Sequence, residues 1–343
     1  MQLPEFFVFL SGENRTLGVN ETEALLELRG VDPDISWFGR LGIFETKEDH
    51  TKFLRKRAAM LKYSGIVIAE VKTAVKEIGQ ISESKIESMI EHEESFRIRT
   101  QSLDSDDSSE VRRRITIALG SIIQRVTGAS VSLENPDVEF RLFVMRDVMF
   151  VCKSIESSLR SHLIKKQSQR LPSFHPSVMN ALVAMVMCNL AKLERDDLVF
   201  DPYCGVGGIL FEASRIGCKV IGMDVEWLRL QGAKNNLSSL KGGEFNLIQS
   251  DAQRMPLTHC NGVVTDPPYG QASSTYGSRA KDLLSALLEQ IPEILGKEGR
   301  ACICSSSELK LGNLAEERGF TIERKVSIRV HRSLTREIVV LKN

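Results

Sequence analysis

The sequence predicts an α/β protein in which a doubly wound, mostly parallel sheet follows two smaller α+β units. Three observations support this fold class. Strand and helix patterns alternate regularly over residues 173–343, as they do where helices cover both faces of a parallel sheet. The preceding blocks, residues 1–75 and 76–155, combine strands and helices in other orders. The length of 343 residues, about twice that of a typical domain, agrees with several folding units.

The first block, residues 1–75, has the element order βαββαβ of a ferredoxin-like fold. Apolar and β-branched runs predict its strands, and a helical spacing of apolar residues predicts its helices. Gly39 and Arg40 form a tight link between the two middle strands. The expected elements are strand 6–10, helix 20–29, strands 35–38 and 41–45, helix 47–61 and strand 64–71.

The second block, residues 76–155, predicts another small α+β unit. Acidic and serine side chains at 104–108 supply capping oxygens before a long helix, and Gly128 ends that helix. Asp147 marks a turn between two β segments. The stretch 156–172, rich in Ser, Lys and Gln, predicts a linker or a bridging helix. The expected elements are helix 82–91, strand 95–100, helix 109–126 and strands around 129–133 and 138–153.

The third block, residues 173–343, carries the alternating pattern. No helix separates its last two strands, so the chain should finish as an antiparallel hairpin added to a parallel sheet. The expected helices are 176–193, 207–216, 227–240, 280–295 and 308–318. The expected strands are 198–201, 219–224, 245–249, 262–266, 300–305, 321–331 and 335–342.

Composition excludes several classes of protein. With 42% hydrophobic and 26% charged residues, the chain is typical of globular proteins. The longest apolar run, residues 181–188, is far too short to cross a bilayer, and Glu5 interrupts the first apolar stretch, unlike a secretory signal. We therefore expect a cytoplasmic protein with no membrane contact. Seven cysteines form no CxxC pair, which argues against disulfides and a zinc ribbon, and no metal site is expected.

The charge distribution leaves an RNA partner open. The 45 basic residues balance 45 acidic ones, so net charge gives no sign of nucleic-acid binding. Locally, residues 141–170 hold seven Lys or Arg, and residues 318–336 hold six. A solvated face explains such runs as well as an RNA-binding surface does.

A glycine-rich segment, residues 201–208 (DPYCGVGG), joins a predicted strand to a predicted helix. Glycines let the backbone approach a ligand and turn N–H groups toward an anionic end of it. Leu210 stands where the nicotinamide-binding GxGxxG pattern has its last glycine, so that fingerprint is incomplete. A tight strand-to-helix turn is the alternative interpretation.

Asp224 ends the next predicted strand, 19 residues after Gly205. An acid at this place in a nucleotide-binding sheet accepts the hydroxyl protons of a ribose. The alternative is an N-cap for the helix that begins at Trp227.

The third motif, residues 266–269 (DPPY), follows the apolar strand residues 262–265. Two prolines fix the backbone and remove its donors, which leaves carbonyl groups facing the cleft. The Asp266 carboxylate and a carbonyl can then accept hydrogen bonds from an exocyclic amine, while the Tyr269 ring stacks on the base that bears the amine. Carboxyl ends of parallel strands are where such sheets bind ligands, which favours this interpretation over a tight turn.

These motifs resemble those of a known family. Residues 201–208 resemble the S-adenosylmethionine-binding DPFCGTGG stretch, and residues 266–269 the catalytic DPPY, of amino-methyltransferases with a Rossmann-like fold. Residues 174–176 (FHP) are similar to the segment that these enzymes place over the methionine end of the cofactor. Residues 331–336 (HRSLTR) resemble archaeal tRNA guanine-10 N2-methyltransferases. That group has a ferredoxin-like domain and a THUMP domain before its Rossmann-like methyltransferase domain.

The resemblance implies a domain organisation, an activity and a partner. The implied domains are a ferredoxin-like domain at 1–75, a THUMP RNA-binding domain at 76–155, a linker at 156–172 and a Rossmann-fold methyltransferase domain at 173–343. The implied reaction is S-adenosylmethionine-dependent methylation of the exocyclic N2 amine of guanosine 10 in tRNA. We expect tRNA as the partner and no obligate protein partner. The resemblance leaves open whether one methyl group or two are transferred.

The resemblance also implies the site residues. Asp266 and the Pro267 carbonyl would hold the amine, with Pro268 and Tyr269 completing the catalytic motif. The residues implied for cofactor binding are His175, Asp201, Cys204, Gly205, Gly207, Asp224, Asp251, Ala252 and Asp266. For Asp251 a helix cap is the alternative role, and for His175 a buried hydrogen-bonding one. The chain departs from the family pattern at Tyr203, Val206 and Met185, where Phe, Thr and Arg are expected.

Two other functions remain open. Asp-Pro-Pro-Tyr suits any exocyclic amine, so an adenine N6-methyltransferase acting on RNA or DNA is the enzymatic alternative. A noncatalytic tRNA-binding protein is the other. Enzymes that methylate a pyrimidine carbon need a thiolate near this point, and Pro268 occupies the position where Pro-Cys would be diagnostic, so that class is rejected.

Overall fold

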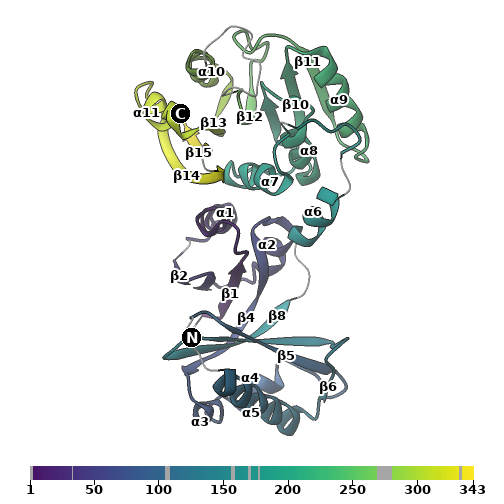
Figure 1. The fold of residues 1–343 in the computed structure, drawn as a ribbon, viewed down its shortest axis with the longest axis vertical. Coiled ribbons are helices and arrows are strands. Elements are labelled where there is room, and N and C mark those ends of the chain that lie inside the picture. Colours follow the sequence, from purple (N-terminus) through teal and green to yellow (C-terminus); the bar gives the residue numbers. More distant parts are fainter. Residues whose placement is uncertain are drawn as a thin grey trace. The chain divides into compact units, whose positions relative to one another are not determined.

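The computed structural model describes residues 3–32, 34–104, 109–155, 159–168, 171–176, 178–268, 280–331 and 334–343. The chain divides into two compact units, each built around one sheet (Figure 1). The first unit comprises residues up to Gly12, Val31–Lys56 and Leu61–Ser158. The second comprises Glu13–Gly30, Arg57–Met60 and Leu159–Asn343. Within the described ranges, no helix combines the length and apolar character that crossing a bilayer requires.

An eight-stranded sheet forms the first unit, in the order β2-β3-β1-β4-β8-β7-β5-β6. The long strand β4 pairs with β1 on one side and with β8 on the other, so the strands of the first two sequence blocks form one continuous sheet. The strands are β1 (Glu5–Leu10), β2 (Ile35–Phe38), β3 (Leu41–Glu45), β4 (Leu61–Lys72), β5 (Ser95–Ser102), β6 (Ser130–Val131), β7 (Val138–Val144) and β8 (Val148–Ile155). Apart from α1 (Arg15–Glu27), the helices in this part of the chain are α2 (Thr51–Arg57), α3 (Val75–Ile78), α4 (Glu83–Glu87) and α5 (Ser109–Thr127).

Helix α5 covers one face of this sheet with an apolar stripe. Ile115, Leu119 and Ile123 recur every four residues and are fully buried, in one core with Phe96 and Phe140 of the sheet. The expected helix 82–91 is instead the short helix α4, preceded by α3.

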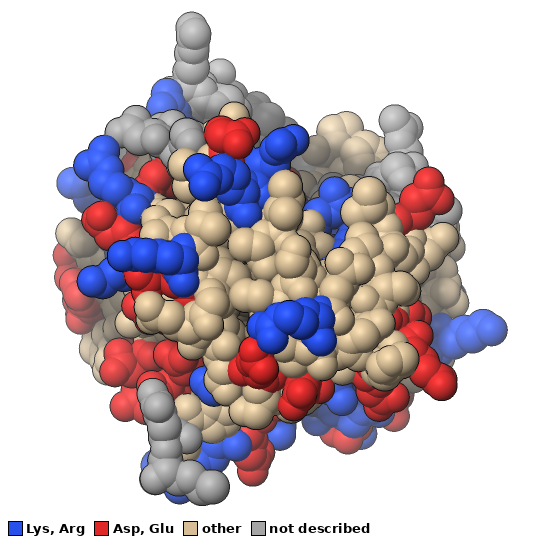
Figure 2. Space-filling model, turned by 90° about the horizontal axis from the view of Figure 1, so that it is seen from below, with Lys and Arg blue, Asp and Glu red and all other residues tan. Residues whose placement is uncertain are grey.

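Lys and Arg side chains are interspersed with Asp and Glu on the face drawn in Figure 2, in keeping with the zero net charge.

A seven-stranded sheet forms the second unit, in the order β11-β10-β9-β12-β13-β15-β14. Strands β9 to β13 pair in parallel, whereas β15 is antiparallel to both β13 and β14, which confirms the predicted terminal hairpin. The strands are β9 (Leu198–Asp201), β10 (Lys219–Asp224), β11 (Phe245–Gln249), β12 (Cys260–Thr265), β13 (Leu295–Ser306), β14 (Thr321–His331) and β15 (Leu334–Lys342). The helices are α1 (Arg15–Glu27), α6 (Leu159–Ser168), α7 (Ala181–Leu190), α8 (Gly208–Ile216), α9 (Trp227–Ser238), α10 (Ala280–Ile294), the 3-10 turn η1 (Ser307–Leu309) and α11 (Leu311–Glu316).

Successive residues of the central strands β9 and β12 point to opposite faces of the sheet and belong to two separate hydrophobic cores. Val199 and Val264 belong to the core that contains residues of α7, α8 and α9. Their neighbours Phe200 and Val263 belong to the core that contains residues of α10 and α11. Because side chains alternate across a strand, helices cover both faces of this sheet, and the predicted doubly wound α/β fold is confirmed. All seven cysteines are free and buried.

Helix α1 belongs to the second unit although it lies within the first sequence block. Asn14 caps it, accepting the Leu17 N–H at 2.9 Å, so the helix begins five residues before the expected start at residue 20. The fully buried Glu21 carboxylate accepts the N–H groups of Ala59 and Met60, each at 2.8 Å. It also accepts the Asn189 side-chain amide of α7 at 2.7 Å.

Replacing Glu21 with Gln should remove a pH dependence of stability. Burial raises the pKa of this carboxyl from 4.5 to about 7. The folded chain therefore binds more protons than the unfolded chain between those values, and the free energy of unfolding falls as the pH rises. Between about pH 5 and about pH 7.5, the contribution of Glu21 to this fall is roughly 2 kcal/mol. Urea unfolding at about pH 5 and about pH 7.5 measures it.

The control for this experiment is Glu23→Gln on the same helix, which should keep the wild-type fall in stability between the two pH values. Glu21→Gln should also lower stability throughout, because an amide cannot accept all three hydrogen bonds. A pH dependence equal to that of the wild type in Glu21→Gln would contradict the assignment.

Candidate active site

The carboxyl ends of three adjacent parallel strands form the candidate site. Strands β10, β9 and β12 are neighbours in the sheet, and they end at Asp224, Asp201 and Thr265, with Asp266 following β12. A cavity of about 390 Å³ opens at this edge. The structure brings most predicted site residues to its lining, namely His175, Asp201, Cys204, Gly205, Asp224, Asp251, Ala252, Asp266, Pro267 and Pro268. Tyr269 lies outside the described residues.

Two glycines shape the loop between β9 and α8. Gly205 and Gly207 have φ angles of 52° and 80°, in the left-handed region that other residues rarely adopt. A Cβ atom on Gly205 would meet no described atom within 4 Å, so the backbone is open toward the cavity there. A Cβ atom on Gly207 would lie 3.2 Å from the Cβ atom of Ala233. Gly207 therefore permits close packing of α8 against α9, and it does not line the cavity.

Asp201 joins two strands of the sheet beneath the cavity. Its Oδ1 atom accepts the Thr265 hydroxyl at 2.6 Å and the Tyr203 N–H at 3.1 Å, and the side chain is almost fully buried. Burial, acting with the charges of Asp266 and Asp224, raises the pKa of Asp201 to about 7. Asp201 thus fixes the end of β9 against β12.

Cys204 lies in the same loop and is also buried. Burial raises the pKa of its thiol well above the ordinary value, with the nearby Asp201 and Asp224 acting in the same direction. The side chain is therefore a neutral thiol at neutral pH, which is the wrong ionisation state for a nucleophile.

Asp224 holds the glycine loop to the end of β10. Its Oδ2 atom accepts the Gly205 N–H at 3.0 Å, and its Oδ1 atom accepts the Glu226 N–H at 2.9 Å. Burial raises the pKa of Asp224. The N-cap residue of α9 is Glu226, so the alternative of Asp224 as that N-cap is wrong.

Asp251 follows β11 at the same edge and is exposed. Its Oδ1 atom accepts the Gln253 N–H at 2.9 Å, in a turn rather than at the start of a helix. The helix-cap alternative for Asp251 is therefore wrong as well.

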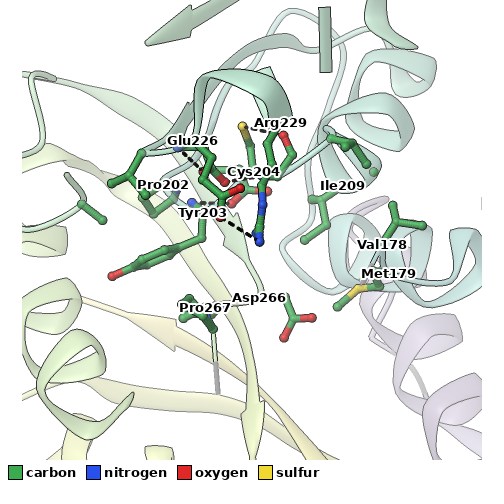
Figure 3. A pocket seen from close by; sticks show the side chains of 18 of the residues that line it. Val178, Met179, Pro202, Tyr203, Cys204, Ile209, Glu226, Arg229, Asp266 and Pro267 are labelled. Atoms are coloured by element: carbon green, nitrogen blue, oxygen red, sulfur yellow. Dashed lines mark hydrogen bonds and ion pairs between the residues drawn. The ribbon is translucent and has the colours of Figure 1, made fainter. Parts of the chain in front are cut away.

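Two pairs of side chains lie on opposite sides of the cavity in Figure 3. Glu226 and Arg229 lie on one side, joined by an ion pair of 3.0 Å, and Asp266 and Pro267 lie on the other. Across from Asp266, the Arg336 guanidinium of β15 approaches the carboxylate to 3.7 Å. The site therefore contains two acids with different settings. Asp224 is hydrogen-bonded to the glycine loop, and Asp266 is followed by two prolines that restrict the backbone.

Several lining residues were not predicted from the sequence. They come from the approach to α7, from the start of α9 and from the terminal hairpin: Val178, Met179, Val225, Glu226, Arg229, Leu334 and Arg336. Glu226 and Arg229 are three residues apart at the start of α9, and this i,i+3 spacing of opposite charges is a signal that could have found them. Arg336 ends the HRSLTR segment, but only the pairing of β15 with β13 brings it to the cavity.

Several of the described basic residues in the two basic stretches are paired within the protein. Arg141 pairs with Glu139 and lies over the Tyr63 ring. Arg160 donates to Glu13 at 2.5 Å, and the half-buried Arg324 donates to Glu23 at 3.0 Å and to Glu27. The exposed members include Arg146 and Arg329. Contact of these stretches with tRNA stays a prediction.

Family models match both parts of the chain. Residues 169–338 match the RMKL-like methyltransferase domain, and residues 72–152 match the THUMP domain. Among solved structures, the chain is similar to TrmN from Thermus thermophilus, with a TM-score of 0.57 and 19% identity over 99% of both chains. It is also similar to SMU.472, a putative methyltransferase complexed with SAH, with a TM-score of 0.58 and 13% identity. At these identities the structural similarity establishes the fold.

Curated relatives extend along nearly the whole chain. The tRNA (guanine(10)-N2)-dimethyltransferase of Methanothermobacter thermautotrophicus is 31% identical over 340 residues, covering 98% of this chain and 99% of the relative. The enzyme of that name from Methanocaldococcus jannaschii is 27% identical and covers 97% of this chain and 98% of the relative. These matches confirm the resemblance expected from the sequence motifs, and the chain belongs to the tRNA (guanine(10)-N2)-dimethyltransferase family.

Proposed function

We propose that this protein methylates the N2 amine of guanosine 10 in tRNA, with S-adenosylmethionine as the methyl donor. One observation carries the proposal: a single cavity of about 390 Å³ holds both the Gly205–Asp224 corner and the Asp266-Pro267-Pro268 corner. A cavity of this size falls within the range of small-molecule sites. We propose that the protein acts in the cytoplasm without an obligate protein partner. Residues 76–155 are proposed as the tRNA-binding THUMP domain, and residues 173–343 as the methyltransferase domain.

The residues of the first corner fit the cofactor. The open backbone at Gly205 and the start of α8 at Gly208 provide a surface for its carboxylate end. An ionised carboxylate has about four lone-pair sites, and backbone N–H groups occupy two of those on Asp224, which leaves acceptors for ribose hydroxyls. Asp251 and Ala252 line the next part of the cavity and are proposed for the adenine. Bound there, S-adenosylmethionine supplies an electrophilic methyl group on a sulfonium.

The residues of the second corner fit the amine. The lone pair of a guanine N2 amine is delocalised into the ring, so the amine is a poor nucleophile. The Asp266 carboxylate and the Pro267 carbonyl accept hydrogen bonds from its two hydrogens and turn its lone pair toward the methyl donor. As the new N–C bond forms and the S–C bond breaks, the Asp266 carboxylate takes up the one proton that the amine loses. Tyr269 is proposed to stack on the flipped base. The neutral Cys204 thiol agrees with direct transfer without a covalent enzyme intermediate.

The alternatives are less well supported. An adenine N6-methyltransferase could use the Asp266 corner, but the named relatives along nearly the whole chain are guanine-N2 enzymes. A noncatalytic tRNA-binding protein has no need for the cavity that joins the two corners.

Incubation with labelled S-adenosylmethionine and an unmodified tRNA transcript should place the label in N2-methylated guanosine. Digestion to nucleosides and chromatography identify the product and show whether one or two methyl groups are transferred. A transcript with adenosine at position 10 is the matched control and should remain unlabelled. Label in N6-methyladenosine, or none in any nucleoside, would remove the proposed function.

Replacing Asp266 with Ala should lower the turnover number by roughly 100-fold or more, because the amine loses its acceptor. Affinity for the cofactor, measured by calorimetry, should stay close to that of the wild type. Glu244→Ala, at an exposed acid paired with Lys219 at 3.7 Å, is the control and should keep normal turnover. Normal turnover in Asp266→Ala would show that another group holds the amine.

Replacing Asp224 with Ala should mainly weaken cofactor binding, whereas Asp266→Ala mainly lowers turnover. Loss of charged hydrogen bonds to the ribose and to the loop should weaken cofactor binding roughly 10- to 100-fold. Turnover at saturating cofactor should fall far less than in Asp266→Ala. Calorimetry and steady-state kinetics on the two variants separate the two corners of the site, and unchanged cofactor affinity would overturn the role of Asp224.

A further inference from the structure

The terminal hairpin adds a cation to the cavity. Strand β15 runs antiparallel to β13, so its first residues lie at the edge where the parallel strands end. Arg336 is paired with Ser306, the last residue of β13, and with Ile328 of β14. Leu334 and Arg336 are two residues apart on one strand and both line the cavity. The pairing on both sides holds Arg336 at a fixed position on a rigid element.

Arg336 faces the corner that we propose for the amine. Its Nη1 atom is 3.7 Å from Oδ2 of Asp266, and the two side chains are 25% and 15% exposed. Of the described lining residues, Arg229 is the other cation, and it pairs with Glu226 on the far side of the cavity. Arg336 is therefore the guanidinium placed to meet whatever base presents its amine to Asp266.

The order of groups on a purine makes this position informative. A carboxylate accepts hydrogen from an exocyclic amine whether the base is guanine or adenine. Guanine additionally carries N1–H beside its amine, followed by the acceptor O6 on the same edge. Adenine has no acceptor at the O6 position. Arginine is the side chain most often paired with guanine O6 and N7, through its two-pronged donor group.

We infer that Arg336 donates to O6 of the target guanine while Asp266 accepts from its amine and N1–H, so that Arg336 selects guanine over purines that lack O6. This inference rests on the proposed function and adds the residue that sets its base specificity. On the protein, the acceptor Asp266 lies beside the donor Arg336. On guanine, the donating amine and N1–H lie beside the acceptor O6, so the two edges are complementary. A buried hydrogen-bonding group left without its partner penalises the wrong base strongly.

The test compares two tRNAs that differ at one base. One carries guanine at position 10, and the other carries 2-aminopurine, which keeps the N2 amine but lacks both O6 and N1–H. The loss of N1–H is the same for all three proteins, so only the difference between the variants reports on O6. The kcat/KM for methyl transfer is measured with both tRNAs for the wild type, Arg336→Ala and Arg329→Ala. Arg329 is an exposed arginine of the same hairpin outside the cavity lining, so its variant controls for the loss of one charge near tRNA.

The wild type should prefer guanine, and Arg336→Ala should lose roughly tenfold to 100-fold of that preference. The loss should arise from a slower reaction with guanine, whereas the rate with 2-aminopurine stays close to that of the wild type. Arg329→Ala should keep the wild-type preference. Arg336→Met, which retains the apolar stem, should behave as Arg336→Ala does and provides a second variant if the alanine variant unfolds more readily.

Equal losses with both tRNAs would overturn the inference, because Arg336 would then act on Asp266 or on a phosphate rather than on O6. Lost cofactor affinity in Arg336→Ala, or a wild type without preference for guanine, would overturn it as well. A wild type that methylates neither tRNA at N2 would instead overturn the proposed function. The two failures are therefore distinguishable.

Discussion

The parallel pairing of β9 with β10 and β12 is the constraint on which the site depends. It brings residues from separate parts of the chain to one edge, since parallel strands all end on the same side. The buried hydrogen bond between the Thr265 hydroxyl and Asp201 joins the ends of β9 and β12. Asp224 then ties the glycine loop to β10 through the Gly205 N–H. The backbone around the cavity is thus fixed by the protein before any ligand binds.

The electrostatics of the cavity agree with the proposed methyl donor. The described lining contains two cations, Arg229 and Arg336, against a larger set of acids, namely Asp201, Asp224, Glu226, Asp251 and Asp266. Such an excess of carboxylates favours a ligand with a positively charged sulfonium. Burial moderates the excess, because it raises the pKa of Asp201 to about 7 and also raises that of Asp224.

The two compact units do not follow the blocks of the sequence. Helix α1 lies between β1 and β2 in the chain, yet it packs with α7 and β14 of the second unit. The Glu21 carboxylate and the Arg324 ion pairs supply the polar part of this packing. A buried acid raises the cost of separating these elements, since its hydrogen bonds would be lost. The packing therefore groups α1 with the second unit rather than with the strands that flank it in the sequence.

The sequence by itself determined the fold class, the terminal hairpin, the family and ten of the residues that line the cavity, because strand patterns and short motifs at strand ends are local signals. Tertiary structure decided the rest. It separated Gly205, which is open to the cavity, from Gly207, which packs on α9. It also brought Arg336 to Asp266 across 70 positions of sequence. Such contacts depend on strand order and register, which no local pattern of residues specifies.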